Sequence, residues 1–367
     1  MSISADIAIV GAGMAGASLA AAIGGAARVV LIEAEEQPGY HATGRSAAFW
    51  SETYGGPAIQ PLTTASGGFL EANGFLRPRG ALTIATAGDE RRLDTLAAEF
   101  AGSGVHLVRL DRAGLDAAVV GLRPQWVAGL AEPSCRDIDV AALHAYYLAS
   151  ARRAGAEIIN DARVSNIARN GATWALETRS GKVHAPVLVN AAGAWASEIA
   201  AMAGAQPIAI TPYRRTMVQL AVDPPASTTA PLIMDAAGSF YFKPEAGGRV
   251  WLSPHDETAT PPCDAAPEEI DIAYAIDRFE RAINWRVLRR EHAWAGLRSF
   301  SPDRAPVYGF DTSVAGFFWF AGQGGFGIQT APAAADIGAA LILGKAMPAT
   351  LATLDLDRYA PRRFSRG

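Results

Sequence analysis

The chain has 367 residues, of which half are hydrophobic and 19% are charged, and its formal net charge is -4. This length and composition are typical of a globular protein with two domains, or with one domain that carries a large insertion. Acidic and basic residues are interspersed along the sequence, so we expect no nucleic-acid partner. The two cysteines, Cys135 and Cys263, are too few for a disulfide framework and lack metal-ligand spacing. We therefore expect a cytoplasmic protein without a metal site.

The first elements in chain order are a strand, a helix and a second strand. Residues 6–10 are a short apolar run that predicts a strand buried on both faces. An Ala-rich stretch at 17–23 predicts a closely packed helix, and residues 28–33 predict the second strand. Asp6 and Arg28 interrupt this otherwise apolar region, so we expect neither a signal peptide nor a transmembrane segment.

The turn between the first strand and the helix carries the sequence Gly11-x-Gly13-x-x-Gly16. Glycines at this spacing allow a tight turn, a close approach of the backbone to a pyrophosphate, and close helix–strand packing. Glu33 ends the second strand, where a carboxylate can accept hydrogen bonds from ribose hydroxyls. Together these residues predict a dinucleotide-binding βαβ unit, which would serve NAD as well as FAD.

The middle of the chain mixes loops, strands and helices. Residues 37–46 predict a loop and residues 67–75 a connection, whereas residues 89–101 and 137–154 predict helices. Between residues 208 and 297, alternating hydrophobic and polar residues indicate an antiparallel sheet, with a helix at 271–288. The predicted strands lie at 81–85, 157–159, 163–168, 173–178, 187–193, 216–222, 240–243 and 249–253.

A last apolar strand at 317–321 leads into a second glycine-rich turn and an Ala-rich helix at 329–343. The whole pattern predicts an α/β nucleotide-binding domain of Rossmann type with an inserted α+β substrate domain, whose sheet is mainly antiparallel. We assign residues 1–75, 140–207 and 305–367 to the first domain. Residues 76–139 and 208–304 are assigned to the second.

Two features favour FAD over NAD as the dinucleotide. Small and hydroxyl-bearing residues from His41 to Ala48 suit a segment that follows the cofactor beyond its pyrophosphate. The turn from Gly322 to Gly327 precedes a helix, whose N-terminus would stabilise negative charge on a reduced flavin.

The chain also resembles the FAD-dependent D-amino acid oxidase and dehydrogenase superfamily, which includes glycine oxidase and sarcosine oxidase. Within that superfamily it is most similar to the bacterial D-arginine dehydrogenases. The stretches that carry the resemblance are GYHATGRSAA at 39–48, VNAAGAW at 189–195, FYFKP at 240–244, WAGLRSF at 294–300 and QGGFGIQT at 323–330.

This resemblance implies hydride transfer from the Cα atom of an amino acid to flavin N5, which gives an imino acid and then a 2-oxo acid. It implies that Arg298 and Arg214 clamp the substrate carboxylate, a task for which the arginine fork is well suited. Tyr54 and Tyr241 would close over the substrate, and the backbone of Gly325 would lie near its amine. Whether Arg214 or its neighbour Arg215 faces the site is left open.

The residues expected to contact FAD come from both glycine-rich turns, the segment after the second strand, and the strand ends between them. They are Gly11, Gly13, Ala15, Gly16, Glu33, Ala34, His41, Thr43, Arg45, Ser46, Ala47, Ala48, Val164, Ala192, Gly193, Trp195, Gly322, Gly324, Gly325, Phe326, Gly327 and Ile328.

Two positions differ from the D-arginine dehydrogenases. Gly80 stands where those enzymes have an acid for the cationic side chain, and Phe49 stands in place of a histidine. The resemblance then implies a D-amino acid with a neutral or apolar side chain. Two alternatives stay open, since Glu52 could replace the missing acid, and Arg77 or Arg79 could favour an acidic substrate.

Some sarcosine oxidases hold FAD through a cysteine near the stretch that matches residues 297–300. No cysteine is present there, so we expect non-covalent FAD. Two other functions remain open: a FAD-dependent 2-hydroxy acid dehydrogenase, and the FAD-holding subunit of a larger electron-transfer complex. The electron acceptor, oxygen or a quinone, is also open, and a quinone would imply peripheral contact with a membrane.

Overall fold

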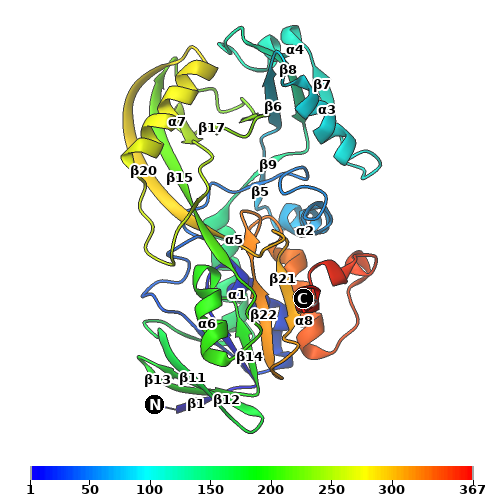
Figure 1. Cartoon of the computed structure of the whole chain (residues 1–367), viewed down its shortest axis with the longest axis vertical. Helices are drawn as coiled ribbons and strands as arrows, with labels where there is room; N and C mark the ends of the chain where they lie inside the picture. The colour runs from blue at the N-terminus through cyan, green and yellow to red at the C-terminus, as the bar shows by residue number, and fades with distance from the viewer. Residues whose placement is uncertain (1, 366–367) are drawn as a thin grey trace.

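A six-stranded, mostly parallel sheet forms the lower half of the molecule in Figure 1. The computed structural model describes residues 2–365. In the order β10-β3-β2-β14-β22-β21, the first five strands are parallel and β21 is antiparallel to β22. The strands are β2 (Ile7–Val10), β3 (Val29–Ile32), β10 (Glu157–Ile159), β14 (Val187–Asn190), β21 (Val307–Phe310) and β22 (Phe317–Ala321).

Both faces of this sheet are covered, which explains why β2, β3 and β22 are apolar without alternation. One face packs against Ala-rich helices, where small side chains let helix and strand approach closely. The other face packs against one helix and a four-stranded sheet. The helices of the first face are α1 (Met14–Ile23), α5 (Val140–Arg153) and α8 (Ala331–Leu343), with α2 (Gln60–Ala72) beside α8, and the helix of the second face is α6 (Ala196–Ala203).

The four-stranded sheet lies at the bottom of Figure 1 and closes the second face. Its strands follow the order β1-β13-β12-β11, and Trp174 and Leu176 carry its buried side against the central sheet. The strands are β1 (Ser2–Ser4), β11 (Val164–Asn170), β12 (Thr173–Thr178) and β13 (Gly181–Ala185).

A ten-stranded sheet forms the upper half of the molecule, and two long strands, β15 and β20, run into it from the lower half (Figure 1). Its pairings are antiparallel except for β16 with β6. The strands are β6 (Ala81–Thr86), β7 (Val108–Leu110), β8 (Trp126–Glu132), β15 (Thr211–Asp223), β16 (Leu232–Asp235), β17 (Tyr241–Glu245), β18 (Arg249–Ser253), β19 (Thr258–Ala259), β20 (Arg286–Phe300) and β23 (Gln323–Gly324).

The amphipathic helix α7 (Glu269–Ala282) covers one face of this sheet. Its buried side places Phe279 against Phe242 and Trp285, with ring centroids 5.0 and 6.3 Å apart. The shorter helices α3 (Glu90–Glu99) and α4 (Arg112–Ala118) pack on β6, β7 and β8. This core is separate from that of the lower sheet.

Two connections bring the sheets together around one region. The end of β20 pairs with β23, so that Ser299 lies opposite Gly324 of the second glycine-rich turn. A small sheet of β4 (Phe49–Trp50), β9 (Arg136–Ile138) and β5 (Leu76–Pro78) links the segment after β3 to the strand β6. The ten-stranded sheet is thereby connected to two segments that the sequence predicts to contact the cofactor: the residues after β3 and the second glycine-rich turn.

Three local predictions differ from the structure. Residues 67–75 largely continue helix α2, where the glycine at 67 admits the Trp50 ring: a Cβ atom there would lie 2.9 Å from Trp50 Cζ2. The predicted helix at 137–154 begins only at Val140, because Asp139 caps it through the backbone N–H of Ala142 at 2.9 Å. The predicted helix at 271–288 ends at Ala282, because residues from 286 onward pair with β15 and tertiary pairing overrides helix propensity.

The predicted fold class is confirmed: a Rossmann-like α/β sheet is combined with a second, mainly antiparallel sheet. The domain limits assigned from the sequence remain predictions. Within residues 2–365, the structure contains no helix whose length and apolar character would let it cross a membrane.

Candidate functional site

A cavity lies where the central sheet meets the end of β20. Its wall combines the turn after β2, the residues that follow β3, the turn after β14, and the second glycine-rich turn. Met217 on β15, Tyr241 on β17 and Arg298 on β20 complete it from the other sheet. The carboxyl ends of β2, β3 and β14 therefore open into this cavity, which is where nucleotide ligands bind in open α/β sheets.

The first glycine-rich turn forms one end of the cavity. Gly11 has φ +101°, and a Cβ atom on it would lie 2.5 Å from the carbonyl oxygen of Ala191. Gly13 lies in the wall at the N-terminus of α1, where helix N–H groups face the space. Gly16 lies behind the wall, and a Cβ atom there would be 1.9 Å from the oxygen of Gly11. The three glycines thus permit the turn, the open cradle and the close packing that the spacing predicts.

Glu33 occupies the position expected of the acid after the second strand. The residue is 8% exposed, and its Oε2 accepts a hydrogen bond from the N–H of Ala12 at 2.9 Å. Oε1 accepts another from the N–H of Glu35 at 3.1 Å. These bonds fix the carboxylate in the wall, beside the turn that would hold a pyrophosphate.

The segment after β3 crosses the cavity and is tied to α1. Thr43 Oγ1 accepts a hydrogen bond from the N–H of Met14 at 2.9 Å. His41 lies 3.0 Å from a Glu35 oxygen, and its ring packs against Trp195 at a centroid distance of 4.6 Å. Arg45 borders the cavity, but its guanidinium pairs with Asp264 and donates to the backbone oxygens of Ala265 and, on β20, Ala295.

Most residues predicted to contact FAD line the cavity. Gly16, Gly322 and Phe326 do not. Gly322 provides the turn after β22 with φ +76°, and Phe326 packs against Phe300 at a centroid distance of 5.9 Å. The lining residues are Gly11, Gly13, Ala15, Glu33, Ala34, His41, Thr43, Arg45, Ser46, Ala47, Ala48, Val164, Ala192, Gly193, Trp195, Gly324, Gly325, Gly327 and Ile328.

At the other end of the cavity, Arg298 presents a guanidinium that is fixed by its neighbours. Nη2 donates a hydrogen bond to the hydroxyl of Tyr54 at 2.7 Å, and the side chain is only 13% exposed. Burial lowers the pKa of this guanidinium, yet an arginine stays charged at any physiological pH. The backbone of Gly325 passes so close that a Cβ atom there would lie 1.7 Å from Nη2.

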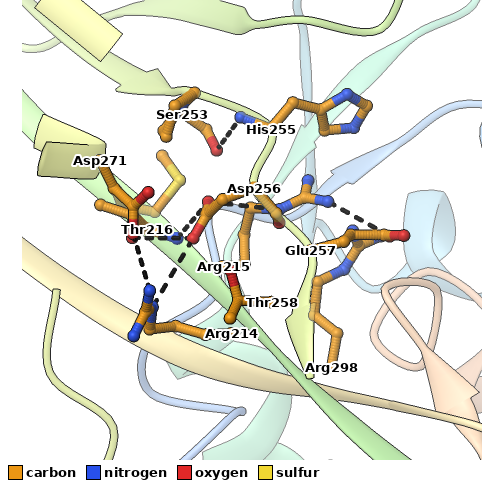
Figure 2. Close-up of polar contacts among 12 residues, drawn as sticks. Arg214, Arg215, Thr216, Ser253, His255, Asp256, Glu257, Thr258, Asp271 and Arg298 are labelled. Atoms are coloured by element: carbon orange, nitrogen blue, oxygen red, sulfur yellow. Dashed lines mark hydrogen bonds and ion pairs between the residues drawn. The ribbon is translucent and has the colours of Figure 1, made fainter. Parts of the chain in front are cut away.

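The two neighbouring arginines of β15 point to opposite sides of the strand, as successive strand residues do (Figure 2). Arg214 is paired with Glu268 and, at 2.9 Å, with Asp271, and it lies outside the cavity wall. Arg215 lies in the wall, and its Nη1 is buried without a hydrogen-bond partner among the described residues. Of the two arginines between which the sequence left the choice open, the structure thus places Arg215 in the cavity wall and Arg214 outside it.

The remaining wall around the arginines is aromatic and apolar. Tyr54 and Phe49 pack with ring centroids 4.8 Å apart, and Phe49 packs edge-on to Tyr241 at 6.2 Å. The Tyr241 hydroxyl lies 3.1 Å from the Met217 sulfur, and burial raises the pKa of this tyrosine. A ligand here would meet rings and a thioether on several sides and cations on one.

Two buried residues that the sequence did not single out hold the loop of Tyr54. Glu132 is 3% exposed and accepts hydrogen bonds from Ser51 Oγ at 2.8 Å, Thr53 Oγ1 at 2.6 Å and the N–H at position 52 at 2.7 Å. Gln329 donates to the Tyr54 carbonyl at 3.1 Å. No local sequence pattern predicts that Glu132 and Gln329 hold this loop, because the residues they bond are distant in sequence.

None of the residues named as alternative charge selectors reaches the cavity wall. Glu52 accepts hydrogen bonds from Thr64 at 2.6 Å and Ser134 at 3.4 Å. Arg79 pairs with Asp137, and Arg77 donates to the carbonyl oxygen of residue 74 at 2.8 Å. Among residues 2–365, the carboxylates that line the cavity are Glu33, Glu35 and Glu198, all on the central-sheet side.

This cradle fits a dinucleotide: glycines leave space at a helix N-terminus, an acid follows the next strand, and the cavity continues past both. The chain belongs to the FAD-dependent oxidoreductase family, whose model matches residues 6–341. Its cofactor is FAD, which supplies a hydride acceptor when bound. Gly11, Gly13 and Glu33 would hold the ADP half, and the second glycine-rich turn would lie toward the flavin.

Particular relatives and structures resemble the chain to different extents. The hydrogen cyanide synthase subunit HcnC of Pseudomonas aeruginosa is 26% identical over 221 residues, which cover 59% of this chain and 51% of that protein. The chain thus matches about half the length of that relative. Glycine oxidase from Geobacillus kaustophilus has a TM-score of 0.85 and 21% identity, with 98% of both chains covered. L-proline dehydrogenase from P. horikoshii has a TM-score of 0.86 and 23% identity, covering 100% of this chain and 99% of that one.

Proposed function

We propose that the protein oxidises an amino acid at its Cα–N bond, using FAD as the hydride acceptor. The observation that carries this proposal is the pair formed by Arg298 and Tyr54 at the end of the cavity beyond the nucleotide cradle. A fixed guanidinium with a tyrosine hydroxyl beside it is suited to a carboxylate. Glycine oxidase and L-proline dehydrogenase, both named for amino acid substrates, share the fold and support the reaction class.

In this reaction the substrate Cα loses a hydride and its amine loses a proton, which gives an imino acid. Water then hydrolyses the imino acid to a 2-oxo acid and ammonia. Arg298 and Arg215 would hold the carboxylate, and Tyr54 and Tyr241 would exclude water above the Cα atom. Gly325 would place backbone groups near the amine, whose neutral form the buried, cationic surroundings favour.

We propose a substrate with a neutral or apolar side chain. Phe49, Tyr54, Met217 and Tyr241 surround the space beside the arginines, and none of them can pair with a charged side chain. The Glu52 carboxylate accepts hydrogen bonds from Thr64 and Ser134 outside the cavity, so it offers no negative charge to a basic substrate. The D-enantiomer is part of the proposal because the sequence resembles the D-amino acid oxidases and dehydrogenases over five separate stretches.

A second function has a specific observation in its favour. The similarity to HcnC, a protein named as a subunit, is in keeping with a FAD-holding subunit of a larger complex. Such a subunit would bind FAD and a carboxylate substrate in the same cavity but would depend on a partner for turnover. A lone chain that turns over with an artificial electron acceptor would contradict this second function.

The decisive experiment is anaerobic mixing of the FAD-loaded protein with a panel of D- and L-amino acids while the flavin absorbance is followed. We expect bleaching by a neutral or apolar D-amino acid, and much slower bleaching by arginine, lysine and glutamate. Failure of every amino acid to reduce the flavin would overturn the proposed reaction. Faster reduction by L-amino acids would overturn only the stereochemistry.

A further inference from the structure

The segment that follows β18 places two consecutive acids against the arginines of β15 (Figure 2). Asp256 anchors it, because its carboxylate accepts hydrogen bonds from the N–H and the hydroxyl of Thr216 at 2.8 and 2.9 Å. On its far side, β19 pairs with Tyr213 and Arg214. The segment is therefore held at two points, and Glu257 lies between them.

Glu257 is not itself part of the cavity wall, but it reaches two arginines that are, and Figure 2 shows it between Arg215 and Arg298. Its Oε1 lies 3.4 Å from Arg215 Nη2 and 3.4 Å from Arg298 Nη1. The same oxygen accepts a hydrogen bond from Nη2 of the exposed Arg304 at 2.9 Å. One carboxylate of the chain thus contacts both cations that would hold the carboxylate of a substrate.

We propose that Glu257 is an internal competitor for the substrate carboxylate and so sets the affinity of the site for it. This inference rests on the proposed function, since it requires a carboxylate ligand at Arg215 and Arg298. The two contacts at 3.4 Å exceed the usual 2.7–3.2 Å range of N–H···O hydrogen bonds, so an entering carboxylate can replace them.

The Glu257 carboxylate, once displaced from the two buried arginines, could stay paired with Arg304. Arg304 makes the shortest of the three contacts, and its side chain is 48% exposed at the edge of the cluster. A small rotation of Glu257 would keep this ion pair and release the two buried arginines. The Arg215 Nη1 atom has no hydrogen-bond partner among the described residues. The carboxylate of the ligand would accept a hydrogen bond from this atom and from Arg298.

A different reading of the same contacts is that Glu257 holds the arginines in position for the substrate. The two readings predict opposite results when the charge is removed without a change of shape. A competitor, once neutral, leaves the arginines freer and carboxylate binding tightens. A positioning residue, once neutral, lets the arginines move and carboxylate binding weakens.

The test compares the FAD-loaded wild type with Glu257→Gln and with the matched control Glu269→Gln, an exposed acid that pairs with Arg290 outside the cavity. Each protein is titrated with propionate and with neutral propionamide at constant ionic strength, and Kd is taken from the change in flavin absorbance. We expect Glu257→Gln to bind propionate about three- to fivefold more tightly, as loss of a partly exposed ion-pair competitor predicts. Binding of propionamide, and binding by the control variant, should stay at the wild-type value.

An unchanged or weaker propionate Kd in Glu257→Gln would overturn the proposal that Glu257 competes. If neither wild type nor Glu257→Gln responds to propionate and no amino acid reduces the flavin, the proposed function itself fails. Glu257 is 36% exposed and its replacement leaves the Asp256 anchor intact, so the variant should fold as the wild type does. Melting temperatures of all three proteins would reveal any misfolding that could account for a change in Kd.

Discussion

Gly325 and Arg298 approach each other so closely that a Cβ atom on the glycine would lie 1.7 Å from Nη2 and 2.4 Å from Nε of the arginine. The same Nη2 atom thus lies against bare backbone and donates a hydrogen bond to the Tyr54 hydroxyl. Any side chain at position 325 must displace the group that would bind the substrate carboxylate.

The Gly325→Ala variant should therefore lose activity while it keeps its folded structure. Because a guanidinium ends a flexible side chain, it can move aside at little cost in stability, but it then leaves its bond with Tyr54. We expect kcat/KM to fall about 100-fold or more, the effect of misplacing a binding group by an ångström or so. Bound FAD per protein should stay unchanged. Gly68→Ala, on the exposed face of α2 with open space at its Cβ position, should keep wild-type kcat/KM; equal activity of the two variants would contradict the assignment.

The neighbours Arg214 and Arg215 should respond differently to the same substitution. Arg215→Gln removes a cavity cation, so KM for the amino acid should rise at least about tenfold. The melting temperature should also fall, because Arg215 loses its 2.8 Å hydrogen bond to the Asp256 carbonyl. Arg214→Gln leaves Asp271 without its buried partner, so the free energy of unfolding should fall by on the order of 3 kcal/mol. Measurement of KM and of urea unfolding for both variants checks this, and a larger KM effect in Arg214→Gln would reverse the assignment.

The contrast between these arginines shows where sequence reasoning stops. The βαβ unit could be predicted because its signals are local: glycines within six residues, and an acid at the end of the next strand. The face of β15 that meets the cavity depends on its register with β20, whose paired residues lie 63 to 89 positions later in the chain, and a shift of one residue exchanges inside for outside. The sequence alone therefore predicted an arginine at this place but not which one.

Glu132 and Gln329 illustrate the same limit for residues that support a site. Glu132 bonds residues 79 to 81 positions away, and Gln329 bonds the Tyr54 carbonyl 275 positions away. Their types are ordinary in a strand or near a helix start, so no spacing rule marks them. The C-terminal end of the helix predicted at 271–288 is wrong for a related reason, because long-range pairing with β15 extends the strand to Arg286.

Replacement of Glu132 by Gln should loosen the loop that carries Tyr54. The amide cannot accept all three hydrogen bonds that the carboxylate accepts, so we expect lower stability by about 1–3 kcal/mol and a higher KM. Urea unfolding of both proteins at pH 7 measures the difference, and equal stability of the two proteins would contradict this role of Glu132.

FAD should be released when the protein is denatured in acid. Cys135 is buried away from the cavity, but Cys263 lies in the wall near Trp195, so it is the cysteine that could contradict non-covalent binding. We expect the yellow colour in the supernatant after acid precipitation of both the wild type and Cys263→Ser. Colour that stays in the wild-type pellet and moves to the supernatant in Cys263→Ser would establish a covalent link through that residue.

His255 should make the protein less stable in mild acid. Its ring lies 5.7 Å from that of Tyr241, its Nδ1 lies 2.8 Å from the carbonyl oxygen of Gly238, and burial lowers its pKa to about 4. The unfolded chain binds a proton here near pH 6.5, whereas the folded protein does not until about pH 4, so stability is lost as pH falls between these values. The loss should be about 2–3 kcal/mol, and His255→Asn, which cannot take up this proton, should lose that much less over the same range. Urea unfolding of both proteins at pH 7 and pH 4.5 checks the difference, and parallel losses would show that His255 titrates alike in the folded and unfolded states.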